Sequence, residues 1–161
     1  MKIQSHTRGL QLSIRSAVAA GVALTIADLC RLDFPIYAMI AAVIVTDLSP
    51  AQSRTLAFQR LAGTVIGGIF GAGMSALLPH TAWAIASGIF CAMLICYPAR
   101  IPAGAKIAGY TCGIIMLSFN SEPWAYALYR FFETILGIVV ALAVSVVPKL
   151  LTTEEKSSAS H

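Results

Sequence analysis

The sequence predicts an all-α integral membrane protein with six transmembrane helices, built as an inverted repeat of three helices plus three. Hydrophobic residues make up 58% of the 161-residue chain and charged residues 11%, whereas about a quarter of an average soluble domain is charged. The 39 residues from Leu61 to Ala99 contain no Asp, Glu, Lys or Arg. A soluble domain this small could not hide such a run, because much of its surface must be polar. The third observation is a repeated pattern, RxxxTxxG, which begins at Arg60 and again at Arg130.

The first three helices are expected over residues 12–29, 34–46 and 61–78. These apolar runs lack the alternation of barrel strands and are rich in Ala, Gly, Leu and Ile, so they indicate helices. The second run has only 13 residues between the flanking charges of Asp33 and Asp47. As a helix it rises only about 20 Å, less than the roughly 30 Å of a bilayer core. Either its charged ends extend this helix, or the helix is discontinuous and shielded by the rest of the protein.

The last three helices are expected over residues 82–97, 107–119 and 126–147, and the fifth is short like the second. Prolines mark several limits, at Pro79 before the fourth helix, at Pro98 after it and at Pro148 after the sixth. The chain is therefore expected to form one transmembrane domain. That domain covers residues 1–151, with halves of about 10–79 and 80–150 and a polar cytoplasmic tail over 152–161.

The loops predict the orientation, because Lys and Arg collect on the cytoplasmic side of a membrane. With the N-terminus inside, only Arg31 and Arg130 fall toward the outside. The inner side receives Lys2, Arg8, Arg54, Arg60, Arg100, Lys106, Lys149 and Lys156. Both termini are therefore expected in the cytoplasm, and the membrane is expected to be the bacterial cytoplasmic (inner) membrane.

The two halves share sequence patterns. The third helix opens with RLAGTVIG at 60–67, and the sixth opens with RFFETILG at 130–137, 70 positions later. A second match relates AVAAGV at 17–22 to AIASGI at 84–89. Because three crossings are an odd number, the second half enters the membrane from the opposite side, as in many secondary transporters. The alternative is chance, since small-residue patterns recur in membrane helices.

The sequence predicts no enzyme, no cofactor, no metal site and no nucleic-acid partner. No Ser-His-Asp, Cys-His or metal-ligand cluster is visible, the four cysteines form no CxxC pair, and the basic residues are scattered singly. The glycine-rich third helix lacks the GK[ST] of a phosphate-binding loop. Its spacing instead predicts close helix packing at Gly63, Gly67 and Gly71, and Gly137 is expected to pack in the same way.

The candidate functional residues are ionisable side chains at membrane depth, where each charge costs roughly 2.5–3.5 kcal/mol or more. Arg15 is expected about one turn inside the first helix, Arg60 begins the third, and Lys106 begins the fifth. Two interpretations of these cations remain open. They extend to the inner phosphates, or they form a cationic vestibule that lowers the barrier for an anion.

Arg130 and Glu133 lie in the outer part of the sixth helix and share a face, because they are three residues apart. Glu133 either neutralises Arg130 as an ion pair or accepts a coupling proton. Tyr110, within the fifth helix, either packs in the core or lines the pathway. The aromatic residues near helix ends are expected in the interfacial belt, namely Tyr37, Trp83, Tyr97, Trp124 and Tyr126.

The order of these motifs resembles the fusaric acid resistance and aromatic acid exporter superfamily. Members carry a short aromatic-led helix that ends in a polar-Pro segment, then a linker and an RLxGTxxG helix. Here the corresponding stretches are FPIYAMIAAVIVTDLSP at 34–50, QRLAGT at 59–64 and RFFETILG at 130–137. The resemblance covers roughly Arg15 to Leu151. One departure is the start of the second helix, Phe-Pro-Ile-Tyr, where a Tyr-Trp pair is common.

The resemblance implies a function. Longer relatives contain two six-helix blocks plus cytoplasmic domains and export aromatic or other organic acids, often driven by the proton gradient. Plant aluminium-activated malate channels are distant relatives whose six-helix subunits form dimers around anion pores. A single block therefore implies a homodimer. By position, the family's motif sites are occupied here by Arg60, Gly63, Thr64, Arg130 and Thr134.

The expected function is export of organic or aromatic acid anions across the inner membrane by an oligomer, with membrane lipid and a small organic anion as partners. The candidate pathway residues are Arg15, Arg60, Thr64, Lys106, Tyr110, Arg130 and Thr134. Two alternatives remain open, an anion channel and a non-transporting membrane scaffold or assembly partner.

Overall fold

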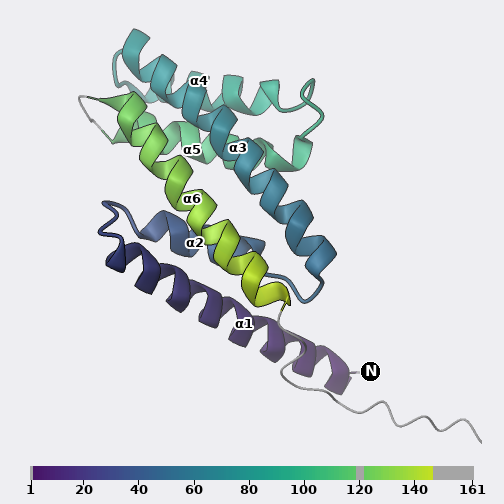
Figure 1. Ribbon diagram of the computed structural model, residues 1–161. Helices are drawn as coiled ribbons and strands as arrows, with labels where there is room; N and C mark the ends of the chain where they lie inside the picture. Colours follow the sequence, from purple (N-terminus) through teal and green to yellow (C-terminus); the bar gives the residue numbers. More distant parts are fainter. Residues whose placement is uncertain (1, 119–121, 147–161) are drawn as a thin grey trace, which may run out of the picture.

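Six α-helices make up the computed structural model, which describes residues 2–118 and 122–146, with side chains from residue 9 onward (Figure 1). The helices are α1 Lys2–Leu29, α2 Ile36–Val45, α3 Pro50–Leu77, α4 Ala82–Ile95, α5 Ala105–Leu117 and α6 Pro123–Val146, and the 3₁₀ turn η1 Pro102–Gly104 leads into α5. All elements in these ranges are helical, which confirms the predicted all-α class. The expected tail over 152–161 and the end of the sixth helix at residue 147 lie outside the described residues.

Two helices are longer than the apolar runs that predicted them. α1 begins at Lys2 rather than residue 12, and α3 begins at Pro50 rather than residue 61. An apolar run marks only the apolar part of a helix, whereas Gln and Arg are also good helix formers and Pro suits the first turn. The expected positions of two arginines are therefore wrong. Arg15 lies near the middle of α1, and Arg60 lies well inside α3.

The helices differ in whether they are long enough to cross a membrane. α1, α3 and α6 each contain a stretch long and apolar enough to cross a membrane. α2 has only 10 residues and α5 only 13. Charged ends do not extend α2, because Thr46 after it is already in extended conformation. Both short helices pack against long ones, α2 mainly against α6 and α5 mainly against α3.

Successive helices run in opposite directions between the left and right ends of the view in Figure 1. α3 and α6 cross the centre of the molecule and contact each other. α1 packs on α2 and α6, and α4 packs on α5 and α3. The outermost helices α1 and α4 therefore flank a central group of four.

α1 and α4 each bury a stripe of every fourth residue. The two stripes are Arg15, Ala19, Ala23 and Ala27 on α1, and Ala84, Gly88, Ala92 and Cys96 on α4. Gly21 lies off the stripe, exposed, with nothing within 4 Å of an added Cβ. The sequence alignment of Gly21 with Gly88 therefore equates two residues in different surroundings. It matched small residues, and this pattern does not indicate which face of each helix is buried.

Glycines allow α3 to approach α5 and α6 to approach α2. A Cβ on Gly67 would collide with the carbonyl oxygen of Ala108, and a Cβ on Gly137 would collide with that of Ala38. The same face of α3 presents Gly63 and Gly71 to the backbone of η1 and α5. The backbones thus meet at distances that leave no room for a side chain.

Replacing Gly137 by Ala should therefore destabilise the protein by about 1–3 kcal/mol, the usual cost of overpacking a well-packed site. The obstacle is a backbone carbonyl, which cannot move aside as a flexible side chain can. Thermal unfolding in detergent, followed by size-exclusion chromatography, measures the change. Gly21→Ala is the matched control and should not lower the unfolding temperature, because its added methyl meets nothing. Equal unfolding temperatures for the two variants would contradict the packing.

Candidate functional site

Four side chains of the charged residue types are buried among the described residues. Arg15 is 3% exposed, and Arg60, Arg130 and Glu133 are each 1% exposed. Arginine and glutamate are almost never fully buried unless they are paired. The burial of these charged groups therefore costs free energy that apolar side chains at the same positions would not cost.

Arg130 lies against the ring of Tyr37. Its Cζ is 3.9 Å from the ring centroid, in the geometry of a cation–π contact. Tyr37 belongs to the first turn of α2, so this contact joins α6 to α2. The Nε and Nη1 atoms of Arg130 are buried and have no hydrogen-bond partner in the described part of the protein.

Arg60 has a corresponding arrangement on α3. Its Cζ is 5.3 Å from the ring centroid of Tyr110 on α5. The Nε and Nη1 atoms of Arg60 are likewise buried without a hydrogen-bond partner within the described ranges. Arg60 and Arg130 are close enough to repel each other electrostatically. We call these two side chains the arginine pair.

Glu133 is held by a distant part of the chain. Its Oε1 accepts a hydrogen bond of 2.8 Å from the backbone N–H of Phe34, and its Oε2 is buried without a hydrogen-bond partner. Glu133 and Arg130 attract each other electrostatically. A direct ion pair between them, expected from the i, i+3 spacing, is not among the contacts of the described residues. The carboxylate instead faces the loop before α2.

Three rings surround this end of α6, and we call Phe34, Tyr37 and Tyr126 the aromatic cluster. The ring of Phe34 meets the ring of Tyr126 edge to face, with centroids 4.9 Å apart. The hydroxyl oxygens of Tyr37 and Tyr126 are hydrogen-bonded at 2.5 Å. The cluster therefore links the loop before α2, the first turn of α2 and the first turn of α6.

The interfacial belt was predicted wrongly for two of its five members. Tyr37 is 9% exposed and Tyr126 is 5% exposed, so neither faces lipid. Proximity to a helix end suggested the belt, but the tertiary structure folds these two ends onto each other. Trp83, Tyr97 and Trp124 are exposed, as expected of belt residues.

The remaining candidates are spread over several elements. The buried Thr64 hydroxyl donates to the carbonyl of Arg60, and Thr134 is buried on α6. Lys106 is exposed at the start of α5, and Tyr110 is 36% exposed. Arg15 lies on α1, which packs on α2 and α6 rather than on α3. The structure thus brings Arg60, Arg130 and Glu133 together and leaves Lys106 at the surface.

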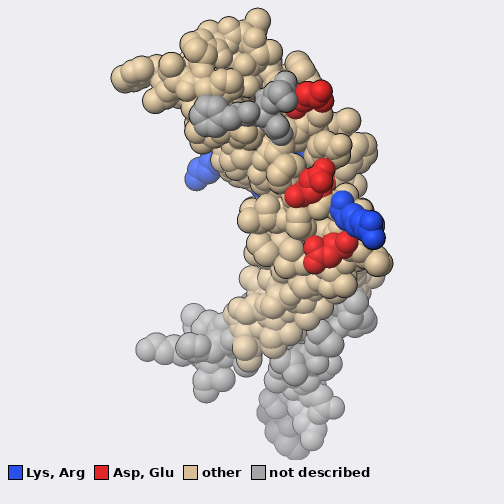
Figure 2. All heavy atoms as spheres, turned by 90° about the vertical axis from the view of Figure 1, so that its left-hand side faces the viewer, with Lys and Arg blue, Asp and Glu red and all other residues tan. Residues whose placement is uncertain are grey.

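The surface charges differ between the two ends of the helices. The exposed residues Asp28, Arg31, Asp33 and Glu122 follow or precede the helix ends at the left of Figure 1. Figure 2 looks onto this end, where the few charged side chains lie among uncharged ones. The opposite end exposes Arg54, Arg100 and Lys106. Of the four exposed cations named here, three therefore lie at this end and only Arg31 lies at the other.

Tyr126→Phe should lower the stability of the protein by about 1–3 kcal/mol, because it leaves the buried Tyr37 hydroxyl without its partner. Unfolding in detergent, monitored by tryptophan fluorescence, measures the loss. Tyr129→Phe on the same helix is the control, since Tyr129 is exposed. If both variants unfold like the parent protein, the buried hydroxyl pair contributes nothing.

The comparisons with known proteins agree with this architecture. The family model described as fusaric acid resistance protein-like matches residues 22–144, which include the arginine pair, Glu133 and the aromatic cluster. No curated protein and no solved structure matches the chain significantly.

Proposed function

Because the chain belongs to the fusaric acid resistance protein-like family, a family of multi-pass membrane transporters, we propose that it exports organic acid anions, aromatic acids among them, across the bacterial inner membrane. The arginine pair would bind the anion during its passage. The proposal also includes an inverted repeat of three helices plus three, and a homodimer of such units.

The buried arginine pair is the observation that carries this proposal. Two guanidinium groups share the centre of the bundle with one buried carboxylate, and both retain buried N–H groups without a hydrogen-bond partner. A cation in an apolar interior is costly unless an anion accompanies it. A carboxylate suits these groups, because guanidinium N–H donors match its two oxygens.

Tyrosine rings support an organic rather than an inorganic anion. One face of each guanidinium lies over a tyrosine ring, and Arg130 also bonds to the side chain of Tyr126. The buried Nε and Nη1 groups of both arginines are left for a ligand. Such a site combines apolar surface with a few fixed donors, as small-molecule sites commonly do. Aromatic carboxylates combine the same two properties.

The helix ends support the inverted repeat. Arg31 after α1 and Arg100 after α4 both have positive φ, at 52° and 59°. In each turn the N–H of the residue after this arginine donates to the carbonyl of the residue four positions before the arginine. The arginine's own N–H donates to the carbonyl three positions before it in both turns. The two turns therefore match, bond for bond, at an offset of 69 positions.

The helix contacts support the same repeat at an offset of 70. The contact between Gly67 and Ala108 has its counterpart between Gly137 and Ala38. Element packing follows the same scheme, since α3 on α5 corresponds to α6 on α2 and α4 on α3 corresponds to α1 on α6. The arginine pair occupies equivalent positions in this scheme. Two inverted halves of this kind suit alternating access, in which one half rocks against the other.

Flux through proteoliposomes tests the proposal. Radiolabelled benzoate, a monovalent aromatic carboxylate, should cross membranes that contain the protein. Arg60→Ala and Arg130→Ala should each reduce this flux by about tenfold or more, since each loses a charge-assisted contact worth about 1.5–3 kcal/mol. Glu133→Gln should also reduce net export if a proton is coupled there.

Arg54→Ala is the matched control for Arg60→Ala, because Arg54 lies on the same helix but is exposed. It should transport at the parental rate. Unaltered flux in correctly folded Arg60→Ala and Arg130→Ala variants would remove the arginine pair from the mechanism. Single-channel currents would favour the anion channel, and no flux in any preparation would favour the scaffold.

Reporter fusions test the proposed orientation, with both termini in the cytoplasm. A periplasm-active reporter inserted after His80, in the loop between α3 and α4, should be active. The same reporter inserted after Arg100, between α4 and α5, should be inactive, because that loop carries the positive charge of the inner side. The opposite result at both sites would reverse the topology.

A further inference from the structure

We propose that the aromatic cluster is an outer gate that closes the route between Arg130 and the outside, and that Glu133 holds this gate shut. The inference rests on the proposed export of organic anions and assigns a role to residues on one side of that route. Phe34, Tyr37 and Tyr126 form the gate, and the hydrogen bond from Phe34 to Glu133 is its latch.

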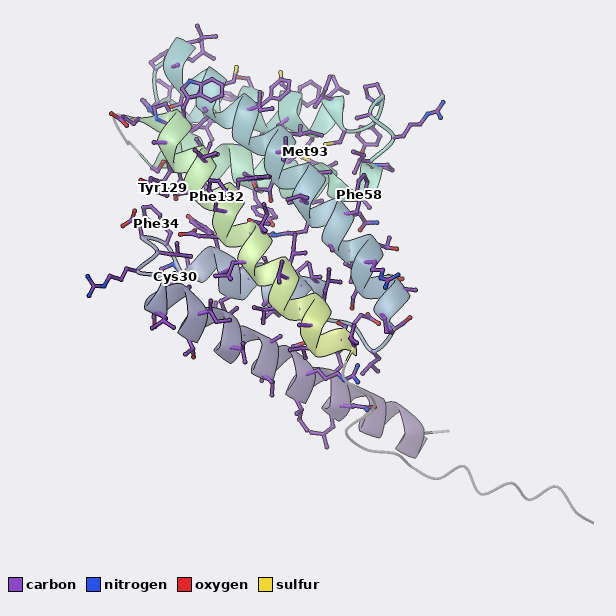
Figure 3. All side chains as sticks on the ribbon, viewed as in Figure 1. Cys30, Phe34, Phe58, Met93, Tyr129 and Phe132 are labelled. Atoms are coloured by element: carbon purple, nitrogen blue, oxygen red, sulfur yellow. The ribbon has the colours of Figure 1, made fainter. Side chains whose placement is uncertain are left out.

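The aromatic cluster lies at one end of the molecule. Phe34 precedes α2, Tyr37 is in the first turn of α2, and Tyr126 is in the first turn of α6. Both helices begin at the end of the molecule where Asp28, Asp33 and Glu122 are exposed. Figure 3 shows Phe34 at this end, between Cys30 of the turn after α1 and Tyr129 of α6, and far from Phe58 of α3. The cluster therefore lies on the outer side of the arginine pair in the proposed orientation.

The three rings of the cluster pack closely against one another and against Arg130. The rings of Tyr37 and Tyr126 are buried, they contact Phe34, and their hydroxyls bond to each other across α2 and α6. Tyr37 also lies directly against the guanidinium of Arg130. An anion bound to Arg130 would have to pass these rings to leave outward. Separating α2 from α6 at this end would break the hydroxyl pair and the edge-to-face contact together.

The aromatic cluster has no equivalent in the other half of the proposed repeat. At the offset of 70 positions, Phe34, Tyr37 and Tyr126 correspond to Gly104, Ile107 and Leu56. No ring stands at any of the three equivalent inner positions. If the three rings served only to pack the helices, the other half should carry rings at the equivalent positions as well, because its glycine contacts and helix ends match. The three-ring cluster is therefore present on one side only, whereas Arg60 on the other side faces the single ring of Tyr110.

Glu133 supplies the acceptor of the latch. Its Oε1 accepts the backbone N–H of Phe34, so a residue on α6 beside Arg130 is tied to the loop that carries the first ring of the gate. A carboxylate accepts such a bond more strongly than a neutral group does. Glu133 also attracts Arg130. It is therefore a positioning residue, which joins the anion site to the gate.

Thiol labelling from the outside tests the gate. Thr134 is buried on α6 one turn beyond Arg130, so Thr134→Cys reports access past the cluster. The background carries Cys30→Ser and Cys91→Ser, because these are the native thiols that are not fully buried. Intact cells are treated with a charged, membrane-impermeant maleimide, and the labelling rate is measured.

Tyr37→Ala and Tyr126→Ala should raise the labelling rate by about tenfold, the change in open population that corresponds to about 1.4 kcal/mol. Trp124→Ala is the control, since Trp124 is in the same turn of α6 as Tyr126 but is exposed. It should label like the parent. Tyr126→Phe keeps the ring and removes only the hydroxyl, so it disturbs folding less than Tyr126→Ala does. It should also raise the labelling rate.

The latch has its own pair of variants. Glu133→Leu removes the acceptor of the Phe34 N–H and should raise the labelling rate, whereas Glu133→Gln keeps an acceptor oxygen and should stay within a few-fold of the parent. Parental labelling in Tyr37→Ala, Tyr126→Ala and Tyr126→Phe overturns the gate. Equal labelling in Glu133→Leu and Glu133→Gln overturns the latch. Benzoate flux by the parent protein is measured separately, so absence of flux counts against the proposed function and not against the gate.

Discussion

Two guanidinium groups buried in an apolar helix bundle set the constraint that the rest of the structure meets. Each charge must be placed where other groups lower its cost, and the helices supply tyrosine rings and one carboxylate for this purpose. The rings come from the two short helices α2 and α5, and the arginines come from the long helices α6 and α3. The arginine pair therefore requires each short helix to lie close against its long partner.

Glycine makes that closeness possible. At Gly67 and Gly137 the neighbouring backbone carbonyl occupies the space of a Cβ, so the helix axes approach more closely than any larger residue permits. In a membrane, such packing replaces the hydrophobic effect as the main force between helices. The same contacts bring Arg60 within reach of Tyr110 and Arg130 within reach of Tyr37. Packing and chemistry thus depend on the same close contacts, those of Gly67 and Gly137.

The matching halves also show where the molecule is not symmetric. Glu133, the aromatic cluster and the exposed Asp28, Arg31, Asp33 and Glu122 belong to one end, whereas the exposed Arg54, Arg100 and Lys106 belong to the other. In the proposed exporter, this difference would let the two sides open and close differently, while the driving gradient would set the net direction. In the proposed inverted repeat, the matching halves would supply the central site, and the residues on one side would supply its polarity.

The sequence by itself determined the helical class, the number and order of the helices, the repeated motifs and the family resemblance. These follow from local composition and spacing, which a bilayer and a 3.6-residue period constrain strongly. It misplaced Arg15 and Arg60 within their helices, assigned Tyr37 and Tyr126 to the lipid interface, and aligned Gly21 with Gly88. Only the tertiary structure decided these points, because burial, the stacking of arginine on tyrosine and the bond from Phe34 to Glu133 join segments far apart in the chain. No local pattern specifies which side of a helix meets which neighbour, so the site existed in the sequence as separate residues and became a site only when the helices packed.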